Sequence, residues 1–432
     1  MKKRLLSVLL AAAMVVSMVA CGGSDDAANN DAANTNTEVA GTEATGNDTV
    51  DYGSGEIKIW VAENVVDFTK TEAEKFLASN EAFAGYTVVV EPVGEGDAAN
   101  NMLTDVEGGA DIFGFAQDQL ARLVSAGALN PVVGDYATWV VEQNDAGAAS
   151  AAVLGDMTYA FPITSDNGYF LYYDKSVITD PTSLEQIVAD AEAAGKNFYF
   201  EINSGWYQPA FFFGAGCTLT YETDANGNFT KANVDYNSEK GLVALKEIIE
   251  LSKSASFQNG SSCSNATNVA AIVDGTWDAG AAKEIFGDNY ACAKLPSFTG
   301  SDGNVYQLGG FGGFKLLGVK PQTEAGKLQV CLQLAQYLSS AEVQIGRYNA
   351  VAWGPSNVTA QADAAVQADE ALAALGQQLA NTIPQGQYPN DYWTLATSLG
   401  DSIIADEYDN ATDDELMAVL ATFQSSCESY VQ

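Results

Sequence analysis

The chain has 432 residues, with 19 lysines and arginines against 56 aspartates and glutamates, no histidine and a formal net charge of −37. This charge argues against nucleic acid as a partner, and the lack of histidine excludes Ser-His-Asp and Cys-His nucleophile pairs and histidine-ligated zinc. A hydrophobic fraction of 47% can fill substantial cores, and the length predicts two or three domains of about 150 residues each.

Residues 1–20 have the pattern of a secretory signal peptide. A basic start at residues 2–4 precedes an apolar run over 5–20, which is shorter than the roughly 20 apolar residues of a membrane-spanning helix. The run ends in small and apolar residues directly before Cys21, and this ending resembles a bacterial lipobox. The resemblance implies cleavage before Cys21 and acylation of this cysteine, which would attach the chain to the lipid bilayer. An ordinary signal peptide with an incidental cysteine is the alternative.

Residues 21–54 have the composition of a flexible acidic tether. They are mostly Gly, Ser, Asp, Asn, Ala, Thr and Glu, and Tyr52 is the only aromatic residue among them. Such a segment cannot bury enough apolar surface to offset the entropy lost on ordering. Together with an acylated Cys21, the tether would place the globular body on the extracellular face of the cell membrane.

The globular body begins with an alternation of strand and helix patterns. Strands are predicted over 56–61, 86–91 and 110–115, with helix patterns over 69–79 and 100–106 between them. This order favours a parallel sheet with right-handed crossovers. The predicted fold class is therefore α/β.

A second cycle begins near Lys196, with a strand over 197–202 and a helix over 242–251. Between them, the sequence Asp-Ala-Asn-Gly-Asn at 224–228 resembles the start of a calcium loop, but Asp235 stands where that loop needs a glutamate. An Asn-Gly pair between β-prone runs is typical of a hairpin turn. We therefore expect a hairpin here, and no metal or cofactor is predicted for the chain.

Five cysteines lie in the globular body. Their wide spacing, without any CxxC motif, argues against a metal cluster, and their odd number leaves at least one thiol free. Cys331 lies on the apolar stripe of a predicted helix, which indicates a buried structural thiol. The pairing of the other four stays open: Cys217, Cys263, Cys292 and Cys427.

Candidate ligand contacts follow the predicted strands, because ligands of open α/β sheets bind beyond the carboxyl ends of the strands. Three segments hold these positions: Glu63-Asn64, Phe115-Ala116-Gln117-Asp118 and Ser204-Gly205-Trp206-Tyr207. Their mixture of carboxylates, amides and aromatic rings suits a carbohydrate, whose hydroxyls bind planar polar groups and whose C–H faces stack on rings. A nucleotide would need a phosphate-binding glycine motif, and neither GxxxxGK[ST] nor a GxGxxG between strand and helix is present.

Half of the six tryptophans are candidates for stacking on the sugar. They lie in loops or at the ends of predicted elements, where binding sites concentrate: Trp206, Trp277 and Trp393. Trp60 lies within a strand and Trp139 within an amphipathic stretch, so both are assigned to the core. Trp353 stays undecided.

Short segments in a fixed order carry a family resemblance. They are Ile59-Trp60; Gly-Ala-Asp-Ile-Phe at 109–113 followed by Leu-Val-Ser-Ala-Gly-Ala-Leu-Asn-Pro at 123–131; Met-Thr-Tyr-Ala-Phe-Pro at 157–162 with Leu-Tyr-Tyr-Asp-Lys at 171–175; Gly-Thr-Trp at 275–277; Ala-Trp-Gly-Pro-Ser-Asn at 352–357; and Ile-Pro at 383–384 before Tyr-Trp at 392–393. In this order and spacing they resemble the extracellular solute-binding proteins of ABC transporters, in the group similar to maltose-binding protein. The match runs over most of residues 55–432.

The resemblance implies a periplasmic-binding-protein-like fold, in which two α/β lobes are joined by a hinge and the ligand cleft lies between them. The N-terminal lobe would hold 55–165 and about 313–358, and the C-terminal lobe about 166–312 and 359–432. The lobes would close on an oligosaccharide, and the closed form would dock on the permease subunits of an ABC importer.

Carried over by position, the resemblance implies sugar contacts from both lobes. Asn64 and Asp118 match polar contacts, Phe115 matches an aromatic contact, and Asp166 matches an acidic contact at the first crossing between the lobes. The three candidate tryptophans match the aromatic stack of the second lobe. With the strand-end positions added, the predicted set is Glu63, Asn64, Phe115, Gln117, Asp118, Asp166, Trp206, Tyr207, Trp277 and Trp393.

Two positions depart from the family pattern, since Gln119 stands where a basic contact is expected and Ser204 where an acid is expected. We expect a monomeric, non-enzymatic receptor for a maltooligosaccharide (an α-glucan), with another oligosaccharide as an open alternative. A surface lectin is a second alternative. A glycoside hydrolase is a third, because Glu63, Asp118 and Asp166 could supply two carboxyl groups about 5 to 10 Å apart.

Overall fold

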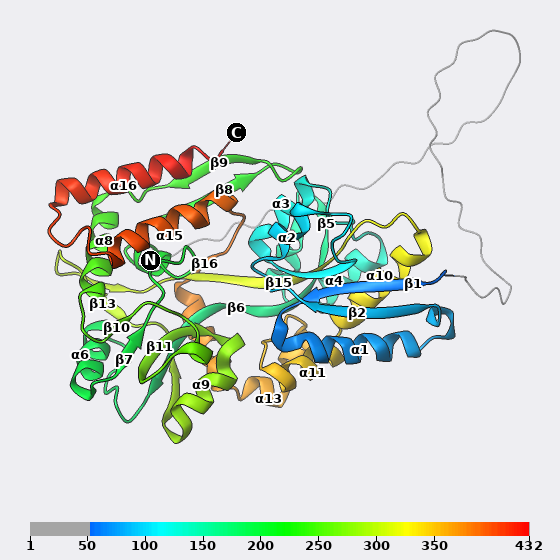
Figure 1. Ribbon diagram of the computed structural model, residues 1–432, viewed down its shortest axis with the longest axis horizontal. Coiled ribbons are helices and arrows are strands. Elements are labelled where there is room, and N and C mark those ends of the chain that lie inside the picture. Colours follow the sequence, from blue (N-terminus) through cyan, green and yellow to red (C-terminus); the bar gives the residue numbers. More distant parts are fainter. Residues whose placement is uncertain (1–51, 432) are drawn as a thin grey trace, which may run out of the picture. The chain divides into compact units, whose positions relative to one another are not determined.

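The computed structural model describes residues 52–431 (Figure 1). The predicted signal peptide, Cys21 and the tether up to residue 51 lie outside the described residues. Among the helices that are described, none combines the length and the apolar character needed to cross a membrane.

A ten-stranded sheet runs through the described residues, and its main path has the order β10-β7-β11-β6-β15-β3-β1-β2. At one end of this path, β1 (Gly55–Val61) pairs in parallel with β2 (Tyr86–Pro92) and with β3 (Ile112–Ala116). The predicted parallel arrangement of these strands is therefore confirmed. Their carboxyl ends lie at the same edge of the sheet.

Two antiparallel strands, β6 (Ala160–Asp174) and β15 (Phe311–Val319), form the middle of the sheet. The first part of β6 pairs with β15, and its last residues pair with β11 (Val269–Gly275) and β12 (Tyr290–Ala293). One long strand thus joins the β1–β3 part of the sheet to the part around β7 (Asn197–Tyr199), as Figure 1 shows. The other described strands are β4 (Val153–Leu154), β5 (Met157–Thr158), β8 (Leu219–Thr223), β9 (Phe229–Val234), β10 (Phe257–Gln258), β13 (Ser297–Thr299), β14 (Val305–Gln307) and β16 (Ile383–Pro384).

The helices follow the same division of the sheet. Those that precede β6 or follow β15 directly are α1 (Val66–Ala78), α2 (Ala98–Thr104), α3 (Leu120–Ser125), α4 (Asp135–Gln143), α5 (Ala146–Ala151), α10 (Ala325–Leu338) and α11 (Ala341–Val351). Those between β6 and β15 are α6 (Leu184–Ala194), α7 (Pro209–Gly214), α8 (Glu239–Ser252) and α9 (Ala279–Phe286). The last part of the chain adds α12 (Val358–Gln361), α13 (Ala364–Gln367), α14 (Glu370–Gln378), α15 (Asn390–Ile404) and α16 (Asp413–Glu428).

Within residues 52–431, buried apolar side chains form three clusters. The first draws on residues 57–163 and 316–353, and the second on 169–311 and 388–427. A smaller third cluster packs α9 and α14 against β6 and β11. The lobe boundaries near 165, 313 and 358 stay a prediction, which these separate cores support.

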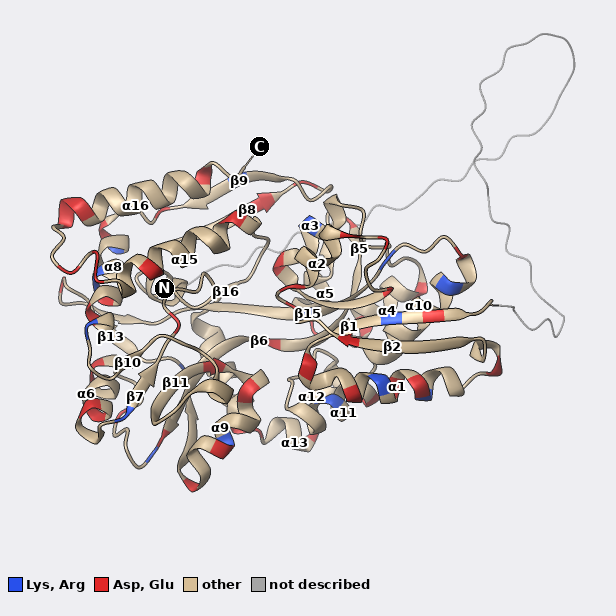
Figure 2. Cartoon of the chain, viewed as in Figure 1, with Lys and Arg blue, Asp and Glu red and all other residues tan. Residues whose placement is uncertain are grey.

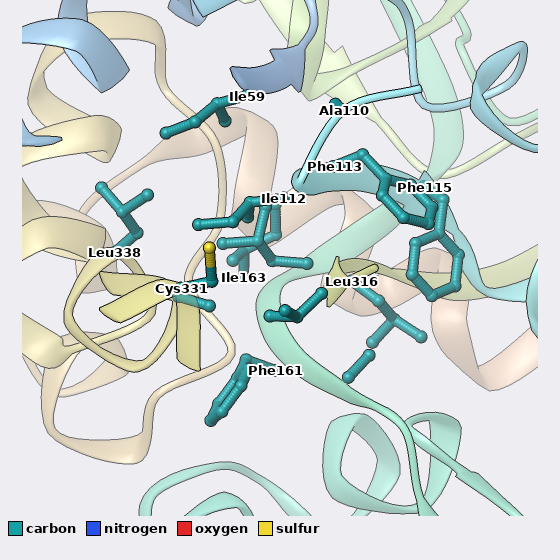
Figure 3. Close-up of a cluster of buried hydrophobic side chains, with 14 of the residues drawn as sticks. Ile59, Ala110, Ile112, Phe113, Phe115, Phe161, Ile163, Leu316, Cys331 and Leu338 are labelled. Atoms are coloured by element: carbon teal, nitrogen blue, oxygen red, sulfur yellow. The ribbon is translucent and has the colours of Figure 1, made fainter. Parts of the chain in front are cut away.

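Cys331 lies in the first cluster with Ile112 and Leu338 (Figure 3), and its side chain is fully buried, as the helical stripe predicted. All five cysteines of the described chain carry free thiols. The hairpin predicted at 224–228 is confirmed, because it joins β8 to β9 and the Asp224 carboxylate accepts from the backbone N–H groups of Asn226 and Asn228. The strand predicted over 197–202 is shorter, since β10 and β11 pair with β7 only up to Tyr199.

Candidate ligand-binding site

A cavity of about 830 Å³ is lined by side chains from both ends of the sheet. This volume lies within the range of about 300–1,000 Å³ that is typical of ligand pockets. Its polar wall comes from the residues after β1, β2 and β3, and its aromatic wall from the residues after β7 and β11 and from the first turn of α15.

Glu63 and Asn64 line the polar wall from the short 3-10 helix η1 (Glu63–Val65), which directly follows β1. Asp118 lines it from η3 (Gln117–Gln119), which follows β3. Because β1 and β3 run in parallel, their ends bring these three side chains to one edge of the sheet. The side chains of Glu63 and Asn64 are exposed, so their carboxylate and amide are available to a ligand.

The Asp118 carboxyl group is buried within a hydrogen-bonded chain. Gln385 Nε2 donates to Asp118 Oδ1 over 2.7 Å, and Asn167 Nδ2 donates to Gln385 Oε1 over 3.1 Å. Burial raises the pKa of Asp118 to about 7, against the opposing effect of the Arg122 charge. The chain joins η3 to β6 through Gln385, and all three of its side chains line the cavity.

The three predicted stacking residues, Trp206, Trp277 and Trp393, all line the cavity, and their contact with a sugar stays a prediction. Trp206 is stacked on Phe311 with the ring centroids 5.1 Å apart, which fixes its orientation. Two glycines let the other rings approach the backbone. A Cβ atom on Gly205 would lie 3.0 Å from Trp393 Cε3, and one on Gly275 would lie 2.2 Å from Trp277 Cη2.

Lys315 and Trp353 are cavity residues that the sequence analysis did not select. The Lys315 ammonium lies 3.6 Å from the centroid of Trp353 and 5.4 Å from that of Trp277. It forms no ion pair with any residue in the described part of the chain. The position of Lys315 in the middle of the apolar strand β15 is the sequence signal that could have revealed this residue. A buried lysine needs an anionic, hydrogen-bonding or aromatic partner.

Arg122 is a second cation that the sequence analysis missed. Its Nη1 donates to Asn100 Oδ1 over 3.0 Å and to Asn390 Oδ1 over 3.1 Å, so it joins α2 and α3 to α15. Burial lowers the pKa of the Arg122 guanidinium, and the Asp118 charge opposes this effect. All three of these side chains line the cavity.

The structure does not bring four of the predicted residues to this cavity. Phe115 is fully buried in the first cluster (Figure 3), because β3 continues to Ala116 and directs this side chain into the core. Tyr207 is buried against Tyr169, with the ring centroids 4.8 Å apart. Gln117 is buried as well, and its backbone oxygen accepts from Gln387 Nε2.

Asp166 is the fourth of these residues, and it ties three segments together instead. Its Oδ2 atom accepts from the Thr276 hydroxyl and from the Gly354 N–H group, each over 2.5 Å. The side chain is 2% exposed and does not line the cavity. Because Asp166 does not line the cavity, only Glu63 and Asp118 remain there of the three carboxylates that motivated the hydrolase alternative.

The two departures from the family pattern have structural roles. Gln119 lines the cavity, but its amide donates to the backbone oxygens of Glu95 and Gly96 and accepts from the Ala99 N–H group. Ser204 accepts from the Trp206 N–H group over 3.2 Å, at the turn that presents this tryptophan. Arg122 and Lys315 supply the positive charge that Gln119 lacks.

A thiol and two carboxylates, those of Cys263, Asp274 and Asp278, lie within 4.8 Å of one another. Their oxygens already have partners, since Asp274 accepts from the N–H groups of Cys263 and Gly275. Burial raises the pKa of Asp274 well above its usual range. A hydrogen-bonded cluster around a protonated Asp274 therefore fits these residues better than a metal ion does.

The cavity combines flat indole rings, with the Lys315 ammonium among them, with carboxylates, amides and the Arg122 guanidinium. Indole faces suit the C–H faces of a sugar ring, and the polar wall suits its hydroxyls. Over the described chain, acidic residues lie on many helices and strands while basic residues are few (Figure 2). The whole surface therefore disfavours anionic ligands.

Residues 73–374 match the family described as bacterial extracellular solute-binding protein. A solved structure with acarbose is 26% identical, with a TM-score of 0.77 over 87% of this chain and 99% of that one. A maltodextrin-binding protein from L. casei BL23 is 23% identical, with a TM-score of 0.72 over 87% of this chain and 99% of that one.

A maltose-maltodextrin-binding protein from Alicyclobacillus acidocaldarius is 17% identical, with a TM-score of 0.69 over 86% of this chain and 100% of that one. No protein with a curated description matches the chain. The family match covers more than half of the chain, and the neighbours share its mixed α/β fold. The chain therefore belongs to the bacterial extracellular solute-binding proteins.

Proposed function

We propose that this protein captures an oligosaccharide, with a maltooligosaccharide as the first choice, and delivers it to an ABC importer. The observation that carries the proposal is the cavity of about 830 Å³, which is lined by three tryptophans together with Glu63, Asn64 and Asp118. One structural neighbour holds acarbose and another is a maltodextrin-binding protein, and both support the same sugar class. The protein binds its ligand and releases it unchanged.

Capture works by closure of two lobes, with boundaries near 165, 313 and 358. Closure buries the sugar between the aromatic and polar walls, and contacts made only in the closed form drive it. Arg122 supplies one such contact, because it bonds to Asn100 of the first lobe and Asn390 of the second. An affinity near 1 µM, about −8 kcal/mol, suits a receptor that must release its ligand to a permease.

A lipid-anchored location fits this role. Acylation of Cys21 and the acidic tether would keep the globular body near the permease and on the extracellular face of the membrane. Mass spectrometry of the membrane fraction tests this part. A diacylated or triacylated peptide that begins at Cys21 supports it, and a soluble protein cleaved elsewhere contradicts it.

Calorimetric titration against α-glucans and other oligosaccharides tests the ligand. Micromolar binding of maltooligosaccharides supports the proposal, and exclusive binding of another oligosaccharide moves the assignment to that sugar. Chromatography after long incubation with excess protein tests the hydrolase alternative. Recovery of the intact oligosaccharide excludes that alternative, and shortened products would establish it.

A further inference from the structure

The hairpin of β8 and β9 ends in a turn over residues 224–228, called the hairpin tip below. The base of the hairpin is packed into the second cluster through Leu219 and Tyr221. Gly227 is buried, although Asn226 and Asn228 on either side of it are exposed. A buried residue at the end of an exposed turn indicates that another element of the protein covers it.

The hairpin tip lies against two segments that belong to the first cluster. A Cβ atom on Gly227 would overlap with the backbone oxygen of Ala121 in α3. A Cβ atom on Gly155, in the turn between β4 and β5, would lie 3.0 Å from the Cβ atom of Ala225. Ala121 belongs to the first cluster, and so does Leu154, which directly precedes Gly155. The hairpin tip therefore joins the two large cores at two places.

The shape of the hairpin tip is fixed by its own hydrogen bonds. The Asp224 carboxylate accepts from the N–H group of Asn226 over 2.8 Å and from that of Asn228 over 3.0 Å. Gly227 has a φ of +84°, which glycine adopts without strain. A preformed tip loses little conformational entropy when it meets the first cluster.

The contact on α3 lies next to the ligand cavity. Ala121 directly precedes Arg122, which lines the cavity, and Asp118 lines it from η3 just before α3. The Ala121 N–H group donates to Gln387 Oε1, so α3 is held from two sides. Residues 224–228 themselves do not line the cavity. The hairpin tip can therefore act on α3 without touching the ligand.

We propose that the β8–β9 hairpin is a latch, which holds the two lobes closed by seating its tip on α3 and on the β4–β5 turn, and which thereby slows release of the bound sugar. This inference rests on the proposed closure of the lobes and adds the element that sets how long closure lasts. Because the latch stabilises the closed form without contacting the sugar, its loss should raise the dissociation rate constant and leave the choice of sugar unchanged.

Stopped-flow tryptophan fluorescence with maltotetraose tests the latch in Gly227→Ala. The added methyl group overlaps with the Ala121 oxygen and should lift the tip from α3. Sugar should then dissociate roughly tenfold faster than from wild type, with a similar association rate constant.

Gly303→Ala is the matched control. Gly303 has a φ of +81° in the turn between β13 and β14, and a Cβ atom there meets nothing within 4 Å. This variant carries the same kind of backbone strain in another hairpin of the second lobe, without the overlap. It should release maltotetraose at the wild-type rate.

A disulfide between positions 155 and 225 tests the opposite change. In the double variant Gly155→Cys with Ala225→Cys, the Cβ separation of 3.0 Å needs only a small increase to reach the roughly 3.5–4.5 Å of disulfides. After loading with maltotetraose and oxidation with diamide, this variant should retain the sugar through buffer exchange and release it on reduction. Each single variant is a control and should release the sugar as wild type does. Peptide mapping confirms the pair, because the described chain has five other free thiols.

Equal dissociation rate constants for Gly227→Ala and Gly303→Ala would overturn the inference. It would also be overturned if the disulfide did not form, or if the oxidised double variant released the sugar at the wild-type rate. If wild-type protein binds no α-glucan, the proposed function fails, and small-angle scattering then decides the latch alone. A larger radius of gyration for ligand-free Gly227→Ala than for Gly303→Ala supports the latch, and equal radii overturn it.

Discussion

At the scale of single residues, the tryptophans of the cavity are the most direct test of sugar binding. Trp206→Ala and Trp393→Ala should each weaken binding by about 1–3 kcal/mol, because each removes a stacking face from the aromatic wall. Calorimetry measures the loss. Trp139→Ala is the control, since Trp139 packs edge-on against Phe161 outside the cavity, and it should lower stability while leaving affinity unchanged. Wild-type affinity in both cavity variants would contradict the stacking role.

Lys315→Met tests the cation between the indole rings. The methionine keeps much of the apolar volume and removes the charge that lies over Trp353 and Trp277. Sugar affinity should fall by about 1.5–3 kcal/mol, the typical contribution of a hydrogen bond to a charged group. The midpoint temperature of thermal unfolding should stay unchanged or rise, because the substitution removes the free-energy cost of burying a charge. A variant that keeps wild-type affinity would exclude Lys315 from ligand binding.

The pH dependence of stability should report the buried Asp118 carboxyl group. Its pKa in the folded protein is raised to about 7, above the ordinary value of 3.8 in the unfolded chain. The folded state therefore holds this proton more tightly, so stability is fully present below about pH 4 and is lost as pH rises towards 7. Asp118→Asn removes this loss, which is roughly 4 kcal/mol at most.

Urea unfolding at pH 4 and pH 8 measures this difference. The free energy of unfolding of Asp118→Asn, relative to wild type, should be larger at pH 8 than at pH 4, because only wild type loses stability as pH rises. Asp278→Asn is a control at a half-exposed carboxylate of the same cavity. Equal pH profiles for wild type and Asp118→Asn would show that Asp118 ionises normally.

At the scale of secondary-structure elements, a substitution at Asp166 distinguishes a structural role of this residue from a role in sugar binding. Its carboxylate joins β6 to Thr276 of η5 (Thr276–Asp278) and to Gly354 before α12. Asp166→Asn should lower the free energy of unfolding by about 1–3 kcal/mol, because it weakens two charge-assisted hydrogen bonds. The folded variant should bind sugar within twofold of wild type. A large loss of affinity without loss of stability would restore Asp166 as a sugar contact.

Elements set by local patterns were predictable from the sequence, whereas those set by distant pairing were not. Alternating apolar residues and short helix patterns revealed β1, β2, β3 and the positions that follow them, so Glu63, Asn64 and Asp118 were found. Lys315 enters the cavity through the antiparallel pairing of β15 with β6 and β3, which no local pattern reports. Phe115 was misplaced because one further residue of strand turns its side chain from the ligand edge to the core.

At the scale of the whole molecule, the position of Gln387 offers a test of closure that leaves the cavity intact. Gln387 Nε2 donates to the backbone oxygen of Gln117 over 2.9 Å, and its Oε1 accepts from the Ala121 N–H group over 2.8 Å. These two bonds link the segment before α15 to η3 and α3, across the proposed lobe boundary. Gln387 itself does not line the cavity.

Gln387→Ala should therefore favour the open form by about 1–2 kcal/mol, the net contribution of two ordinary hydrogen bonds. Small-angle scattering should give a larger radius of gyration for the ligand-free variant than for wild type, and saturating maltooligosaccharide should make the two equal. Sugar affinity should fall several-fold, because less of the variant occupies the binding-competent form. Gln424→Ala is the control, since Gln424 accepts from Asn237 within the second lobe. If sugar reduces the radius of gyration of neither wild type nor Gln387→Ala, the proposal of a hinge between two lobes is wrong. A rigid lectin then accounts better for the cavity than a receptor that closes.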